Sequence, residues 1–154
     1  MLKKKELLIL SRLRQNSRES LTKMSRATRI PVSTIYDRLQ ACQKSIILKN
    51  TSLINFSKLG FNAVVNIMLK VNREKRDEVK DYLEKHKSIN SIYKINNGFD
   101  YMVEGIFKSV KQVDEFVDSL ESRFPIESRE IYYVVEDIKR ESFLSNENSL
   151  ELVF

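Results

Sequence analysis

Three short helices are predicted before residue 45. Apolar residues at helical spacing indicate the first over residues 3–15. Ser20 is a good N-cap for a second helix over residues 21–28, and Pro31 breaks the chain before a third over residues 33–44. The residues expected to face inward are Leu10 and Leu13, with Leu2, Glu6 and Ile9 near them, then Leu21, Met24 and Thr28, then Ile35, Leu39 and Cys42. The second and third helices are joined by a turn of about three or four residues, which is typical of a helix-turn-helix.

Two short β-prone runs follow the third helix. They read I-I-L-K at 46–49 and N-T-S-L-I-N at 50–55, and they predict a hairpin around Asn50 and Thr51. Such a hairpin would be the wing of a winged helix-turn-helix and would bring Lys49 near a nucleic-acid backbone.

The remaining chain alternates strand and helix patterns. Every odd position from 61 to 71 is apolar, which is a strong strand signal. Asn97-Gly98 predicts a hairpin turn, because glycine accepts positive φ. The other expected elements are a helix over 73–86, strands over 89–95 and 99–107, a helix over 110–124, and a strand over 131–135 with its flanks. This βαββαβ order predicts a ferredoxin-like antiparallel sheet with both helices on one face, and hence an α+β fold class for the chain.

The sheet face without helices is expected to carry Val64 and Met68, or their alternates. Such a face is too apolar to remain in water, so we expect a second copy to cover it in a homodimer. The tail beyond Ile138 is polar until L-E-L-V-F at 150–154, and an edge strand, a swapped arm and disorder all remain open for it.

Charge divides unevenly along the chain. Residues 1–60 hold 13 Lys and Arg against 3 Asp and Glu, a net charge of +10, whereas residues 61–154 hold 14 against 18, a net charge of −4. The basic residues lie within periodic segments rather than in a tail, which favours a folded module that binds double-stranded DNA. The candidate DNA-binding residues are Lys23, Arg26, Arg29, Ser33, Thr34, Asp37, Arg38, Lys44 and Lys49.

Other chemistry is sparse. One cysteine excludes an internal disulfide and a Cys-based zinc site, and one histidine leaves no cluster for a metal or a relay. Cys42 is expected to be a small buried hydrophobe and His86 a core-edge side chain, so no cofactor is expected. No apolar run is long enough for a membrane span or a secretory signal, and we expect a cytoplasmic protein.

The order of these pieces resembles the leucine-responsive/asparagine-responsive (Lrp/AsnC) family of transcriptional regulators over about residues 2–139. The matching runs are S-R-E-S at 17–20, S-T-I-Y-D-R-L at 33–39, I-I-L-K at 46–49 and G-F-D-Y at 98–101. The resemblance implies dimers that assemble into octamers, palindromic promoter sites, and an amino-acid effector. The effector site would hold Gly98, Asp100 and Tyr101, with Arg129 where small hydroxyl residues are common. The chain also has Arg29 and Ile46 where the family has glycine, and Lys3 in place of a common Asp.

The domains expected are a DNA-binding domain at 1–48, a wing and linker at 49–60, a dimerisation and effector domain at 61–139, and a tail at 140–154. The function expected is sequence-specific transcriptional regulation. An architectural protein that binds DNA with little sequence preference is the alternative, and an enzyme akin to siroheme decarboxylases is the third hypothesis.

Overall fold

The computed structural model describes residues 4–146, which form two compact units. One unit joins the chain up to Leu53 with the segment that begins at Ile138, and the other spans Ile54–Asp137. Each unit is described by itself. Within residues 4–146, no helix has the length and apolar character needed to cross a membrane.

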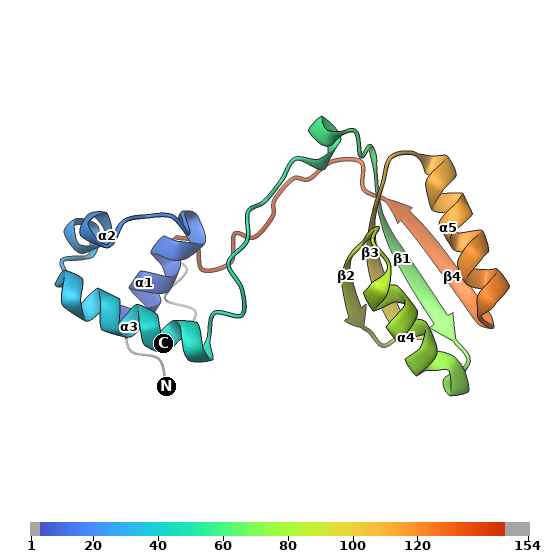
Figure 1. Ribbon diagram of the computed structural model, residues 1–154, viewed down its shortest axis with the longest axis horizontal. Coiled ribbons are helices and arrows are strands. Elements are labelled where there is room, and N and C mark those ends of the chain that lie inside the picture. Colours follow the sequence, from blue (N-terminus) through green and yellow to red (C-terminus); the bar gives the residue numbers. More distant parts are fainter. Residues whose placement is uncertain (1–3, 147–154) are drawn as a thin grey trace. The chain divides into compact units, whose positions relative to one another are not determined.

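The first unit is built from three helices, α1 (Lys4–Gln15), α2 (Leu21–Thr28) and α3 (Val32–Ser45) (Figure 1). The bounds agree with the predicted helices to within one residue, and Leu2 and Lys3 lie outside the described residues. The small core contains Ile9, Met24, Ile30 and Ile35, with Leu13 and Leu21 packed against it. The predicted inward face of α1 was partly wrong, because Leu7 is buried while Leu10 is only half-buried.

Helix α2 has well-defined ends. The Ser20 side chain accepts a hydrogen bond from the backbone N–H of Lys23, as the N-cap prediction requires. At the other end Arg29 takes a left-handed conformation, with φ of 56°, and its N–H donates to the Ser25 carbonyl. The position where the resembled family has glycine therefore keeps the backbone shape that glycine favours, at some strain.

The predicted wing does not form. Residues 47–55 contain neither helix nor strand, and Leu48, Leu53 and Ile54 are exposed. A two-stranded hairpin is marginal without an apolar surface to cover, and the exposure of these side chains shows that they cover none. A 3₁₀ turn at Phe56–Leu59 then leads into the second unit.

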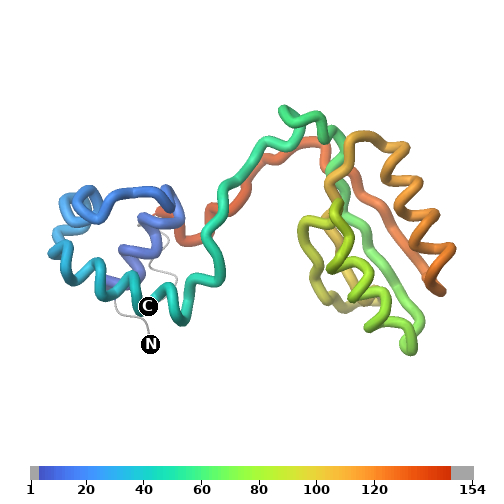
Figure 2. Tube along the Cα trace, viewed as in Figure 1, coloured from blue at the N-terminus to red at the C-terminus, as the bar shows by residue number. Residues whose placement is uncertain are grey.

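The segment from Ile138 to Asn146 returns to the first unit instead of forming an edge strand. The Arg14 guanidinium donates to the Phe143 carbonyl at 3.0 Å and pairs with Glu141 at 3.1 Å. Figure 2 shows this red segment reaching the first helix. The run at 150–154 lies outside the described residues.

The second unit follows the predicted βαββαβ order. Its elements are β1 (Ala63–Val71), α4 (Arg76–Lys85), β2 (Ile89–Lys94), β3 (Tyr101–Phe107), α5 (Val110–Arg123) and β4 (Ile126–Tyr133), with a 3₁₀ turn at Arg73–Lys75. The sheet order is β2-β3-β1-β4 and every pairing is antiparallel. Strand β4 begins five residues before the predicted core of that strand, directly after Pro125.

Both helices of this unit cover one face of the sheet (Figure 1). The alternating residues of β1 from Ala63 to Val71 are buried there, as the odd-position pattern predicted. They pack against Val79 and Leu83 of α4 and against one face of α5. Burial of this size, roughly 2 kcal/mol for each large side chain, makes the sheet–helix layer the main core of the unit.

The opposite sheet face is partly apolar. Cross-strand partners point to the same side, so Met68 with Met102 and Val64 with Ile106 place four apolar side chains there. Tyr93 joins them from β2. On this face Ile106 is buried, whereas Val64, Met68 and Met102 are half-buried.

Candidate nucleic-acid interface and ligand cavity

Helix α3 presents a polar stripe on the side away from its core. Ile35 and Cys42 are buried, and the exposed residues opposite them recur at helical spacing. Of the predicted residues, Ser33, Asp37 and Lys44 lie in this stripe, whereas Thr34 is half-buried. The exposed stripe, called here the outward face of α3, consists of Ser33, Tyr36, Asp37, Gln40 and Lys44.

Sequence reasoning missed Tyr36 and Gln40. Tyr36 is 53% exposed and is the aromatic residue of this face, and Gln40 follows one turn later. Their spacing from Ser33 was the available signal, since residues three, four and seven apart share a helix face.

Arg38 does not belong to the outward face. Its Nη1 donates to Oε1 of Glu6 on α1 at 2.7 Å, and the Glu6 side chain is only 15% exposed. Arg38 lies three residues after Ile35, at the flank of the buried stripe, so its long side chain reaches α1. This ion pair joins α1 to α3.

Basic side chains surround the helices of this unit. Lys23 and Arg26 on α2, Arg29 at its end, Lys44 on α3 and Lys49 beyond it are all exposed. Within residues 4–146 none of the five forms an ion pair. Their charges are therefore available to an anionic partner.

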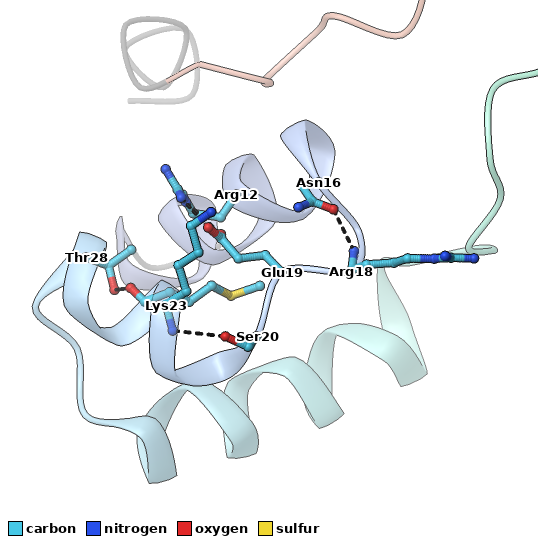
Figure 3. Close-up of polar contacts among 8 residues, drawn as sticks. Arg12, Asn16, Arg18, Glu19, Ser20, Lys23 and Thr28 are labelled. Atoms are coloured by element: carbon cyan, nitrogen blue, oxygen red, sulfur yellow. Dashed lines mark hydrogen bonds and ion pairs between the residues drawn. The ribbon is translucent and has the colours of Figure 1, made fainter.

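A second ion pair closes the turn between α1 and α2 (Figure 3). Arg12 donates from Nε to Glu19 Oε2 at 2.8 Å and from its terminal nitrogen to the other carboxylate oxygen. The Glu19 side chain is almost fully buried. Hydrogen bonding from Arg12 lowers the pKa of Glu19, against the opposing effect of its burial.

Arg18 is a further exposed basic residue of this unit, and it was not among the predicted DNA-binding residues. Its backbone N–H donates to Asn16 Oδ1 at 3.0 Å, which fixes the turn, while the side chain extends away from the helices (Figure 3). It lies in the matched run S-R-E-S, beside the residue that pairs with Arg12.

In the second unit, the hairpin between β2 and β3 borders a cavity of about 280 Å³. Asn97 and Gly98 take positive φ of 65° and 92°, as expected for the Asn-Gly turn. The lining residues are Lys70, Arg76, Asn96, Asn97, Gly98, Phe99 and Asp100. Gly98 and Asp100 were predicted for this site, and the two cations were not.

Asp100 already holds two partners. One of its carboxylate oxygens accepts from the Val71 N–H at 2.8 Å and the other pairs with Arg76 at 2.7 Å. The Nε–H of Arg76 is buried and has no hydrogen-bond partner among the described residues. Arg76, which lines the cavity, therefore has one donor that no described residue uses, next to a carboxylate that is engaged with its neighbours.

Tyr101 and Arg129 do not line this cavity. Tyr101 is buried on β3, where its hydroxyl donates to the Arg76 carbonyl at 3.2 Å and burial raises its pKa. Arg129 pairs across the sheet with Leu69, on the helix-covered side, and its guanidinium binds Glu121 of α5. Both residues contact neighbouring elements of the fold and do not form part of the cavity wall.

The remaining titratable candidates are structural. His86 packs its ring 4.7 Å from Phe116, and burial, aided by Lys87, lowers its pKa. Cys42 is buried as predicted, and burial raises its pKa. No group of three acidic, histidine or cysteine side chains in the described part of the chain is arranged to hold a metal.

Known proteins match this chain over both units. A model of the Lrp/AsnC ligand binding domain matches residues 62–144. An uncharacterised HTH-type transcriptional regulator of Pyrococcus furiosus is 25% identical over 134 residues, covering 86% of this chain and 90% of its own length. The HTH-type transcriptional regulator FL11 of the same organism is 29% identical over 115 residues, covering 74% of this chain and 76% of its own length.

Solved structures agree on the fold. The transcriptional regulator NMB0573 of Neisseria meningitidis, in complex with L-Met, superposes with a TM-score of 0.85 at 19% identity and covers 91% of this chain and 94% of that one. AsnC of E. coli gives a TM-score of 0.80 at 15% identity, with 91% and 96% covered.

Proposed function

The chain belongs to the Lrp/AsnC family of DNA-binding transcriptional regulators, and we propose that it reads its DNA sites through the outward face of α3. The family consists of regulators and not of enzymes, so the enzyme hypothesis is set aside. In this proposal α2 and α3 form the helix-turn-helix, and α3 is the recognition helix that enters the major groove.

The observation that carries the proposal is the division of α3 into two faces. Arg38 is held by Glu6, so base contacts fall to Ser33, Tyr36 and Gln40 on the exposed side. A glutamine amide forms two hydrogen bonds with adenine in the major groove, and an aromatic ring packs against a thymine methyl. This combination favours A·T pairs in the half-site.

The surrounding cations supply affinity. Lys23, Arg26, Arg29 and Lys49 are exposed and form no ion pair within the described residues, which suits contact with phosphates; Lys23 also acts electrostatically on Glu19. Each phosphate that is neutralised releases counterions, so affinity falls as salt rises. Without base contacts the same cations would give an architectural protein, which remains the alternative.

A dimer completes the arrangement. The part of the sheet face that carries Val64, Met68 and Met102 is suited to a second copy, because it is apolar and lies opposite the face that the two helices cover. Two-fold symmetry would then require paired half-sites about one helical turn apart, or a multiple of it.

The hairpin cavity is the proposed effector site. Its free Arg76 Nε–H, together with Lys70, suits the carboxylate of an amino acid. The relative from Neisseria was solved with L-Met, which supports this ligand class. A thermal-shift screen of the standard amino acids tests it, and Arg76→Gln should abolish any response. A response that persists in Arg76→Gln would contradict the proposed site.

Genomic fragments retained by the purified protein and sequenced at two salt concentrations test the regulatory function. A palindromic motif that survives the higher salt supports a specific regulator. Uniform retention that is lost with salt would favour the architectural alternative instead.

A further inference from the structure

A second cavity lies in the same unit, at the end of the sheet where β3 ends and β2 begins. Its volume is about 510 Å³, within the range of small-molecule sites and larger than the hairpin cavity. None of its lining residues belongs to the hairpin cavity, and none is on α3. The proposed effector site therefore does not account for it.

Apolar side chains form the body of this cavity. Phe56, Phe61, Ile89 and Ile106 line it. Both phenylalanines are half-buried, and the backbone fixes them together, because the Phe61 N–H donates to the Phe56 carbonyl at 3.1 Å. The left-handed Gly60, with φ of 85°, makes that turn possible. The aromatic wall is therefore preformed.

Hydrogen bonds to backbone groups also fix another part of the lining. The Ile106 N–H donates to the Ser88 carbonyl at 2.8 Å, and the Ser88 N–H donates to the His86 ring at 3.2 Å. A ligand would thus enter a site that needs little ordering, which favours binding.

The polar lining has one sign of charge. Lys87 and Lys108 line the cavity and no carboxylate does. Neither lysine forms an ion pair with any described residue. Gln112 accepts from the Lys108 N–H at 3.1 Å through its carbonyl oxygen, which leaves its amide N–H₂ as a further donor at the lining.

From this lining we propose that the cavity binds a small organic carboxylate with an aromatic or branched apolar body and no amino group. The apolar body would pack on the two phenylalanines, and the lysines would pair with the carboxylate. A free amino acid fits less well, because its ammonium group would meet two lysines and no carboxylate. The hairpin cavity would then bind an amino acid, and this second cavity would bind a carboxylate of the same body without the amino group.

Three probes with the same aromatic body test the proposal on the full chain. They are 3-phenylpropionate, L-phenylalanine and 2-phenylethylamine, titrated while backbone amide resonances are followed by NMR. The expected order of affinity is carboxylate, then amino acid, then amine, with the largest shifts for the carboxylate at residues 56–61, 87–90 and 106–112. The double variant Lys87→Gln/Lys108→Gln should weaken the carboxylate at least about tenfold.

The matched control is the double variant Lys85→Gln/Lys94→Gln, which removes two exposed lysines of the same unit that line neither cavity and should leave binding of 3-phenylpropionate unchanged. The conservative change Phe56→Leu keeps the turn apolar and should weaken binding less than the lysine pair does. No shifts from 3-phenylpropionate, shifts confined to residues 96–100, or equal affinity for all three probes would overturn the proposal. So would shifts that depend on protein concentration alone, which would mean that a second copy of the chain fills the cavity.

Discussion

The two units are held together by different means. The sheet unit buries fourteen residues in one continuous core between the sheet and its helices. The helical unit has a core cluster of four buried residues, and two ion pairs join its helices and turn, Arg12 with Glu19 and Arg38 with Glu6. The helical unit, which we propose contacts DNA, therefore depends more on its two part-buried ion pairs, because its apolar core cluster is much smaller than that of the sheet unit.

This difference has a functional reason. Under the proposed function, this small helical unit must expose much of its surface to DNA, so few of its side chains remain for a core. Ion pairs that tie α1 to its neighbours compensate for part of that loss. We expect the helical unit to be the less stable of the two and the more sensitive to pH.

Truncation of core residues should show the largest effect. Ile35→Ala removes one of four core residues from the helical unit, and Ile67→Ala removes one of fourteen from the sheet unit. Each should cost about 3 kcal/mol in unfolding free energy. In a calorimetric scan Ile35→Ala should abolish the transition of the helical unit, whereas Ile67→Ala only shifts that of the sheet unit. Equal shifts in both would show that the units unfold together.

Loss of the buried ion pair comes next. Glu19→Gln leaves Arg12 facing a neutral amide and should cost about 2 kcal/mol. The control is Glu84→Gln, which breaks the exposed Lys80–Glu84 pair and should change stability by less than about 0.5 kcal/mol. Denaturant titration followed by circular dichroism measures both, and equal costs would contradict a special role for Glu19.

Low pH should weaken the Arg12–Glu19 ion pair. The folded pKa of Glu19 lies below its ordinary value of 4.5, so its contribution is complete above that value and is lost as pH falls through the folded pKa. The helical unit should therefore destabilise below about pH 4.5 in the wild type, and less steeply in Glu19→Gln. Identical pH profiles for the two proteins would refute this linkage.

The Arg38–Glu6 pair is more exposed and should matter less. Glu6→Gln should cost about 1 kcal/mol, because solvent screens Arg38. The variant should still select the wild-type DNA motif, since Arg38 is assigned to the α1–α3 contact. A changed motif would assign Arg38 to base readout.

The smallest expected effect is a gain in the stability of the helical unit. Arg29→Gly relieves a left-handed arginine and should stabilise the helical unit by about 0.5–1 kcal/mol. The same variant should bind DNA more weakly and with a shallower salt dependence, because a cation is lost. Asn97→Gly is the control in the sheet unit, at a similar φ and with no charge change.

The fold was largely predictable because its signals are local. Alternation at 61–71 and the Asn-Gly turn predicted β1 and the hairpin, and the Ser20 cap predicted the start of α2. The wing failed because β-prone residues at 46–55 have no surface to cover in their own unit.

The candidate site was less predictable because its contacts are long-range. The sequence prediction placed Arg38 among the DNA-binding residues, because the sequence did not reveal that Glu6 lies across from it. The strand register, which carries Arg129 toward Glu121, likewise depends on pairing with β1. Residue periodicity predicts which face of a helix or strand is buried, but the partners of a side chain depend on the tertiary structure.

Selection of bound sequences from a random DNA pool by wild type, Gln40→Ala and Tyr36→Ala tests the account most directly. Gln15→Ala, an exposed glutamine on α1, is the matched control. We expect a palindromic motif for wild type and control, and loss of preference at one base pair per half-site in each α3 variant, worth about 1–3 kcal/mol. An unchanged motif in both α3 variants would contradict the assignment of readout to the outward face of α3.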